Sequence, residues 1–195
     1  MGEYSSNKKN GKGRLIFSDK SFYEGNFKNN EFDGYGTYKT KKYAYEGQFL
    51  SGKKNGNGKI TYFLKNSEYE GEFKNDLKDG FGTEKYSDGS IYKGQYKNDL
   101  KEGKGKLIIK DKDLNIIEYI GEFKNDLKDG FGTEKYSDGS IYKGQYKIDL
   151  KEGKGKLIIK DKDLNIIEYI GEFKKGKLCG KGIINWNNKK NILGI

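Results

Sequence analysis

The side chains that usually carry chemistry are few in this chain. Its 195 residues include no histidine and one thiol, Cys179. Histidine transfers protons best near neutral pH and is the commonest metal ligand, so Ser-His-Asp triads, Cys-His dyads and Cys/His zinc sites are excluded. A single cysteine also excludes an intrachain disulfide. The sequence therefore predicts no catalytic residues, no metal ligands and no cofactor, and we expect the protein not to be an enzyme.

Carboxylates are the remaining candidates for acid–base or metal chemistry. Pairs such as Asp76 and Asp79 lie in polar segments beside lysines, where no pocket is expected to shift a pKa. Two segments resemble an EF-hand calcium loop in the spacing of their oxygen ligands: Asp111, Asp113, Asn115 and Glu122, and again Asp161, Asp163, Asn165 and Glu172. The sixth position of that loop requires glycine but holds Ile116 or Ile166. We expect a polar turn in an extended hairpin rather than a calcium site.

The charge of the chain is basic, with 39 Lys and Arg against 29 Asp and Glu and a net charge of +10. Basic groups outnumber acidic ones by 13 to 6 over residues 1–65 and by 6 to 1 over residues 170–195, whereas the middle carries 20 and 22. Arg14 is the one arginine, and arginine is the side chain that recognises bases and phosphates through paired hydrogen bonds. We therefore expect no nucleic-acid partner.

The N-terminus offers an alternative partner, an anionic membrane surface. Met1 to Ser6 fits the minimal N-myristoylation pattern, although Glu3 is a poor residue after the glycine, and basic residues follow. A lipid and a basic cluster together suffice for membrane anchoring. The candidate lipid-contacting residues are Gly2, Lys8, Lys9, Lys12 and Arg14.

The composition limits where the protein is expected to reside and how thick a hydrophobic core it can form. The first 30 residues are too polar for a signal peptide, and the apolar runs are far shorter than the ~20 residues of a membrane-spanning helix. We expect an intracellular, cytoplasmic protein, with cytoskeletal or membrane association left open. With 32% hydrophobic and 35% charged residues, a thick three-layer core is not expected. Sixteen Tyr, eleven Phe and 29 Gly indicate instead a thin structure in which rings pack against backbone.

A repeat organises these residues. The pattern Tyr-x-Gly-x-(Phe/Tyr) begins at Tyr23, Tyr45, Tyr69, Tyr92, Tyr119, Tyr142 and Tyr169. Each copy is followed by Gly-x-Gly, which begins nine residues after the first glycine, and an incomplete unit precedes them at Gly11. Residues 69–118 and 119–168 match at 48 of 50 positions and differ only at Glu70/Ile120 and Asn98/Ile148. The chain therefore contains a duplication of two repeats.

The period of two within each repeat predicts strands. Tyr23, Gly25 and Phe27 share one face of an extended segment, a polar turn follows, and Gly-x-Gly opens a second strand. Asp88-Gly89 is a tight-turn signal between hairpins. We expect an all-β, elongated, curved, single-layer antiparallel meander of about eight hairpins. Rings should lie over bare glycine backbone, and we expect Gly80 and Gly130 to be covered in this way.

This constellation resembles the MORN repeat family, whose units read YxGxF, a spacer, and GxGxxxY. The resemblance implies a curved β scaffold and a role in cytoskeletal or membrane-junction assembly or in binding helical partner segments. It covers residues 11–186, with the incomplete unit at 11–22 and seven units starting at 23, 45, 69, 92, 119, 142 and 169. Residues 1–10 are expected to be a flexible N-terminal segment and residues 187–195 a C-terminal tail or cap.

We expect a non-enzymatic scaffold that binds an extended or helical protein or peptide partner along an aromatic groove. The alternative function is a membrane-proximal tether that binds anionic lipid through the basic ends. Among partners, a second copy of the chain in a homo-oligomer is also left open. The alternative role for the rings themselves is structural packing over glycine. The candidate groove residues are Tyr23, Phe27, Tyr45, Phe49, Tyr69, Phe73, Tyr92, Tyr96, Tyr119, Phe123, Tyr142, Tyr146, Tyr169 and Phe173.

Overall fold

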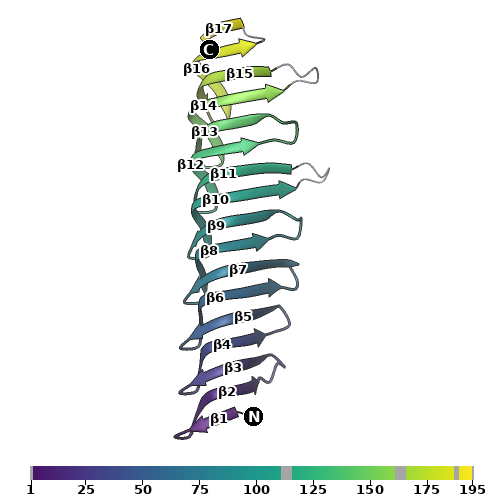
Figure 1. Ribbon diagram of the computed structural model, residues 1–195, viewed down its shortest axis with the longest axis vertical. Helices are drawn as coiled ribbons and strands as arrows, with labels where there is room; N and C mark the ends of the chain where they lie inside the picture. Colours follow the sequence, from purple (N-terminus) through teal and green to yellow (C-terminus); the bar gives the residue numbers. More distant parts are fainter. Residues whose placement is uncertain (1, 111–115, 161–165, 187–188, 195) are drawn as a thin grey trace. The chain divides into compact units, whose positions relative to one another are not determined.

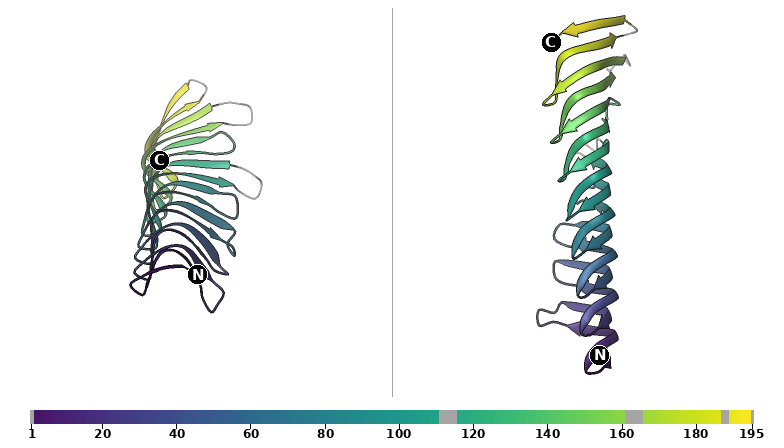
Figure 2. Two further views of the ribbon diagram at one scale, coloured as in Figure 1. Left: turned by 60° about the horizontal axis from the view of Figure 1, so that its bottom comes forward. Right: turned by 90° about the vertical axis from the view of Figure 1, so that its left-hand side faces the viewer.

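The computed structural model describes residues 2–110, 116–160, 166–186 and 189–194. The chain forms two compact units, residues 1–99 and residues 100–195, each built from strands that follow one another in chain order (Figures 1 and 2). Unit 1 contains β1 (Gly2–Ser5), β2 (Lys8–Ile16), β3 (Phe22–Lys28), β4 (Glu31–Lys39), β5 (Tyr43–Leu50), β6 (Lys53–Tyr62), β7 (Ser67–Lys74), β8 (Leu77–Lys85) and β9 (Ile91–Lys97). Unit 2 contains β10 (Leu100–Lys110), β11 (Ile116–Lys124), β12 (Leu127–Lys135), β13 (Ile141–Lys147), β14 (Leu150–Lys160), β15 (Ile166–Lys174), β16 (Lys177–Trp186) and β17 (Lys189–Gly194).

Within each unit every strand pairs antiparallel with the next, which confirms the predicted all-β meander of hairpins. Two-residue turns close the hairpins because both of their residues adopt positive φ. Asn75 and Asp76 have φ of 49° and 73°, and Asn125 and Asp126 repeat the geometry with 49° and 69°. Asn and Asp tolerate this left-handed conformation, and the resulting twist matches that of paired strands.

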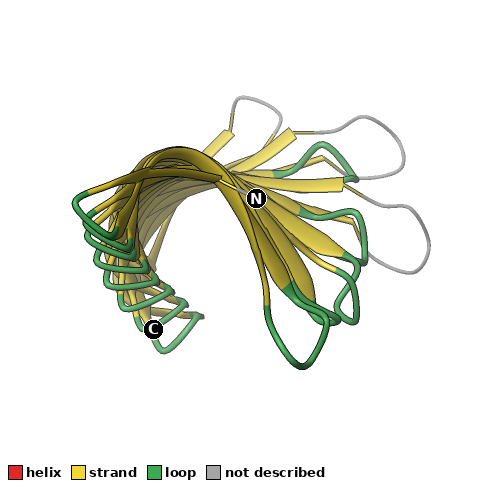
Figure 3. Cartoon of the chain, turned by 90° about the horizontal axis from the view of Figure 1, so that it is seen from below, coloured by secondary structure: helices red, strands yellow, loops and turns green. Residues whose placement is uncertain are grey.

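One glycine from each strand except β17 forms a continuous row across the sheet of each unit, which we call the glycine line; in β17 the position opposite Gly182 is Leu193. In unit 1 it consists of Gly2, Gly13, Gly25, Gly36, Gly47, Gly58, Gly71, Gly82 and Gly94. In unit 2 it consists of Gly105, Gly121, Gly132, Gly144, Gly155, Gly171 and Gly182. Directly beside this line the register shifts in alternate strand pairs, for example between Gly71 and Phe73 and between Gly121 and Phe123. Such bulges bend strands, and the strands are visibly arched in Figure 3.

The hairpin turns also bind the preceding repeat. The amide of Asp76 donates to the carbonyl of Lys54 at 3.0 Å, and the Asp76 carboxylate accepts from the amide of Lys54 at 3.0 Å. Unit 2 repeats the arrangement, since the amide of Asp149 donates to the carbonyl of Lys128 and its carboxylate accepts from the Lys128 amide. Asp76 therefore stabilises a turn, as expected for these solvated carboxylates.

The N-terminal residues differ from the expectation of a flexible segment over residues 1–10. The structure places Gly2–Ser5 and Lys8–Ile16 in paired strands, joined by Ser6 and Asn7 with φ of 52° and 57°. This is the same two-residue turn that closes the other hairpins, so the residues before Gly11 supply the missing half of the incomplete unit. These residues lack the Tyr-x-Gly motif, so the repeat pattern did not predict this strand.

The longer repeats extend their hairpins as expected. Leu107 to Lys110 pair with Tyr119 back to Ile116, and Leu157 to Lys160 pair with Tyr169 back to Ile166. The calcium-loop candidates Asp111, Asp113, Asn115, Asp161, Asp163 and Asn165 lie outside the described residues.

Candidate functional site on the two faces of the sheet

The rings that were expected to line a groove form the core of each unit. Their exposed fractions lie between 0% and 6%. These residues are Tyr23, Phe27, Tyr45, Phe49, Tyr69, Phe73, Tyr92, Tyr96, Tyr119, Phe123, Tyr142, Tyr146, Tyr169 and Phe173. Such small exposed areas leave a partner almost nothing to contact at these positions. The rings pack in the core, which is the alternative role that the sequence analysis left open for them. We call this side of the sheet the aromatic face.

The tyrosines of the motif share a set of contacts, of which Tyr119 is an example. The Tyr119 hydroxyl donates to the carbonyl of Glu122 at 3.0 Å. Its ring packs edge to face against Phe123 of its own repeat and Tyr146 of the next, both at 5.2 Å between centroids. Edge-to-face pairs are favourable beyond the area they bury. In unit 1 burial raises the pKa of Tyr23 to about 12, in spite of its hydrogen bond to Asn26.

The glycine line provides the space for these rings. A Cβ on Gly82 would lie 2.4 Å from the Tyr69 ring, and one on Gly132 would lie 2.3 Å from the Tyr119 ring. Rings therefore cover glycine as expected, but the positions were wrong by two residues. Gly80 and Gly130 have φ of +108° and +105°, and a Cβ there would meet Glu72 or Glu122. The bulge turns these two glycines toward the opposite face, so they are required for backbone conformation and not for a ring.

A pair of buried ionic clusters interrupts the aromatic face. Glu134 accepts hydrogen bonds from the Lys128 ammonium and from the hydroxyls of Tyr136 and Tyr146. Burial alone would raise the pKa of Glu134, but the hydrogen bonds from Lys128 and Tyr136 outweigh it and lower that pKa below its ordinary value. Glu84 has the same partners in the first copy, with Lys78 at 2.5 Å. All donors point at the carboxylate, so the cluster is suited to structure rather than to proton transfer.

The opposite side of the sheet, which we call the polar face, carries the exposed side chains. Strand alternation places there the residue between the two glycines of each Gly-x-Gly. In three repeats this residue is a large ring: Tyr35 is 55% exposed, Phe81 51% and Phe131 61%. Sequence reasoning missed these residues, although an aromatic ring on the solvent side of an alternating strand is a readable signal.

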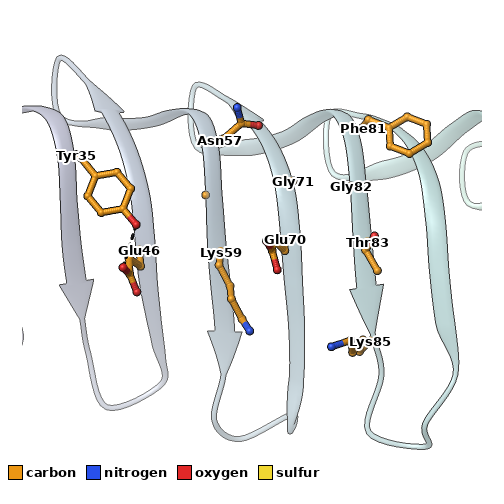
Figure 4. Close-up of a pocket in the computed structure, with 11 residues that line it drawn as sticks. Tyr35, Glu46, Asn57, Lys59, Glu70, Gly71, Phe81, Gly82, Thr83 and Lys85 are labelled. Carbon is orange, nitrogen blue, oxygen red and sulfur yellow. Dashed lines mark hydrogen bonds between the residues drawn. The ribbon is translucent and has the colours of Figure 1, made fainter.

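In unit 1 the polar face is hollowed over β4–β8, with a volume of about 830 Å³ (Figure 4). Tyr35 and Phe81 stand at its two ends, and Gly58, Gly71 and Gly82 are part of its floor. The Tyr35 hydroxyl donates to Glu46 at 2.9 Å, and this hydrogen bond raises the pKa of Tyr35. The charged residues that line the hollow are Glu46, Lys59, Glu70 and Lys85. Their charges balance.

A second hollow of about 440 Å³ lies on the polar face of unit 2, over β12–β16. Its lining residues are Phe131, Lys143, Gly144, Lys154, Gly155, Lys156, Ile170, Gly171, Glu172 and Lys181. Four lysines thus face one carboxylate, and two large apolar side chains lie among them. This hollow differs in charge from that of unit 1.

The candidate lipid-contacting residues lie on the first two strands. Gly2 pairs with Gly13, and Lys8 and Lys12 are exposed. Arg14 is engaged locally, because its guanidinium lies 3.7 Å from Glu24 and 4.6 Å from the centroid of the Phe22 ring. Lipid binding at these residues stays a prediction.

No described segment forms a helix long and apolar enough to span a membrane. Among the described residues there is likewise no cluster of three or more acidic or thiol side chains that could hold a metal ion. Cys179 is a free, half-buried thiol.

Comparisons with known proteins match the chain to a solved structure and to a family model. Among solved structures the chain is similar to the SAS-4 (dCPAP) TCP domain of Drosophila melanogaster, determined in complex with a proline-rich motif of Ana2 (dSTIL). The similarity has a TM-score of 0.48 and 13% identity, and it covers 94% of this chain and 90% of that chain. No curated protein matches the sequence significantly. The MORN repeat model matches residues 1–22, 23–42, 45–63, 69–91, 92–113, 119–141, 142–163 and 169–190, and the chain therefore belongs to the MORN-repeat family.

Proposed function

We propose that this protein is a non-enzymatic scaffold that binds an extended or helical peptide segment of a partner on its polar face. The observation that carries the proposal is the exposure of Tyr35, Phe81 and Phe131 at equivalent positions of three repeats. Large exposed rings are costly on a monomer surface and typical of protein-binding surfaces, where aromatic side chains are common hot spots.

The spacing of the rings matches a segment rather than a small molecule. Tyr35 and Phe81 lie four strands apart, a distance of about 19 Å at the usual strand separation. A segment of about six extended residues, or about thirteen helical ones, spans that length. Between the two rings the floor is glycine backbone, which lets an occupant approach closely. Both hollows are open to solvent and extend along the repeat array, as a linear occupant requires.

Selection of peptides from a random library by the whole protein tests the proposal. We expect selected peptides whose affinity falls at least tenfold when Tyr35, Phe81 and Phe131 are all replaced by Ser, since a hot-spot ring contributes about 2 kcal/mol or more. Leu64→Ser is the matched control, because Leu64 is an exposed apolar residue in the β6–β7 turn, away from the polar-face hollows. Peptides that bind the triple variant unchanged, or no selected peptides at all, would contradict the proposal.

A further inference from the structure

The hollow of unit 2 presents an ordered series of side chains along consecutive strands. Phe131 comes from β12, Lys143 from β13, Lys154 from β14, Ile170 from β15 and Lys181 from β16. The order across the strands is therefore apolar, basic, basic, apolar, basic. Phe131 and Ile170 are exposed, and so are all three lysines.

The balance of charge in this hollow is basic even after its ion pairs are counted. Lys156 is bound to Glu168, so its charge is compensated. The other charged residues that line the hollow are three lysines, Lys143, Lys154 and Lys181, and one glutamate, Glu172. An occupant that buries these lysines gains most if it supplies carboxylates, because like charge or an uncharged surface would leave the ammonium groups desolvated without a partner.

We propose that the hollow of unit 2 binds an acidic amphipathic helix, whose apolar side chains contact Phe131 and Ile170 and whose carboxylates pair with Lys143, Lys154 and Lys181. This inference rests on the proposed function, since it names the chemistry of the partner for the hollow of unit 2.

The strand spacing favours a helix over an extended chain. The strands of the hollow are about 4.8 Å apart. The five contact residues come from successive strands and lie on alternate sides of the glycine line, because each directly precedes its glycine and neighbouring strands are antiparallel. Side chains on one face of a helix recur every three or four residues, which is about 4.5 to 6 Å along the helix axis. Side chains on one face of an extended chain recur about every 6.7 Å and lose register after two strands. A helix that lies over the glycine line and is about 10 Å wide can therefore contact all five positions in turn, Phe131, Lys154 and Lys181 on one flank and Lys143 and Ile170 on the other.

A second copy of this chain matches less well. The hollow of unit 1 carries Glu46 and Glu70 together with Lys59 and Lys85, so it offers the lysines of unit 2 no excess of carboxylate. Charge complementarity therefore favours a separate acidic partner.

The test is a binding titration of the whole protein with two designed peptides. Both are alanine-based helices with Leu at the first and eleventh positions; the acidic peptide has Glu at the fourth, eighth and fifteenth positions, and its neutral counterpart has Gln there. We expect the acidic peptide to bind at least tenfold more tightly at low salt and to lose that advantage as salt is raised, because exposed ion pairs are screened.

Substitutions then locate the site. Lys143→Gln with Lys154→Gln should weaken the acidic peptide about tenfold and leave the neutral one unchanged. Lys147→Gln with Lys174→Gln is the matched control, since these exposed lysines lie on β13 and β15 outside the hollow and remove the same charge. Phe131→Ser should weaken both peptides about thirtyfold.

Each outcome decides between the hypotheses. Equal binding of the two peptides overturns the acidic preference while leaving peptide binding intact. Failure of both peptides to bind overturns the helix proposal, and the library selection then decides separately whether the polar face binds peptides at all. Vesicles of anionic lipid that compete with the acidic peptide for Lys143 and Lys154, or a concentration-dependent dimer abolished by the same double substitution, would assign the patch to a membrane or to a second copy instead.

Discussion

Residues 69–118 and 119–168 are nearly the same sequence in two places, and their two differences separate what the fold dictates from what it leaves free. Asn98 and Ile148 occupy the same turn position with φ of 50° and 51°, although a β-branched residue disfavours this conformation. Glu70 and Ile120 occupy the same strand position, and Ile120 is exposed on the polar face. Turn geometry is thus imposed on whatever residue is present, whereas the polar face changes its chemistry without changing the strand.

The largest expected effect concerns the buried ionic clusters, which should behave alike in the two copies. Glu84→Ala and Glu134→Ala each remove the carboxylate from a lysine whose side chain is only 10% or 13% exposed, and each should lower the free energy of unfolding by about 3–5 kcal/mol in urea denaturation. Lys128→Met with Glu134→Leu should remain close to the wild type, because Leu157 occupies the equivalent position two strands later. A large loss in one copy only would show that the clusters are not equivalent.

The next effect concerns the rings over glycine. Gly82→Ala and Gly132→Ala place a methyl group 2.4 and 2.3 Å from a tyrosine ring, and each should cost about 3 kcal/mol through overpacking. Gly52→Ala is the control, because its Cβ meets nothing within 4 Å and only its φ of +78° is unfavourable, at about 1 kcal/mol. Thermal unfolding of the three variants measures the difference; equal losses would refute the ring-over-glycine account.

A smaller effect is expected at the turn that differs between copies. Ile148→Asn should stabilise the protein by about 1 kcal/mol, because asparagine adopts the left-handed conformation at little cost. Asn98→Ile should destabilise it by a similar amount. Opposite shifts of the urea midpoint would confirm that the backbone, and not the side chain, sets this turn; two shifts of the same sign would contradict it.

The smallest effect is a difference in acid dependence. The pKa of Glu134 lies below its ordinary value of 4.5 in the folded protein, so its stabilising contribution is present above pH 4.5 and is lost as the pH falls through the folded value. Lys128→Met with Glu134→Leu should therefore lose less stability than the wild type between about pH 5 and pH 3. Parallel pH profiles would show that this carboxylate contributes no such stability.

The repeat period and the hairpins could be predicted because each residue of Tyr-x-Gly-x-Phe has a local reason to be there. Two features could not. The bulge beside the glycine line sets three residues of β8, Asp79 to Phe81, opposite Glu72 alone. Simple alternation would place Gly80 and Gly82 on the same face, but the bulge breaks it, and the ring covers Gly82 and not Gly80. Periodicity also shows which residues share a face, but not whether bending and packing bury it. For this reason the fourteen rings of the aromatic face were predicted to line a groove, whereas the exposed rings Tyr35 and Phe81 on the polar face were not predicted as candidates.

The register of the strands has a consequence for how such a chain can lengthen. The strand that begins each copy meets its predecessor in one arrangement: Gly58 faces Gly71, Gly105 faces Gly121, and Gly155 faces Gly171. The first and last strands of an inserted copy therefore pair in the same register as those of the original copy. No new strand interface has to evolve before the longer chain folds. Stability in such arrays is close to a sum of repeat and neighbour terms, so duplication lengthens the sheet in whole steps. Later changes such as Glu70/Ile120 can then alter the chemistry of the polar face one copy at a time.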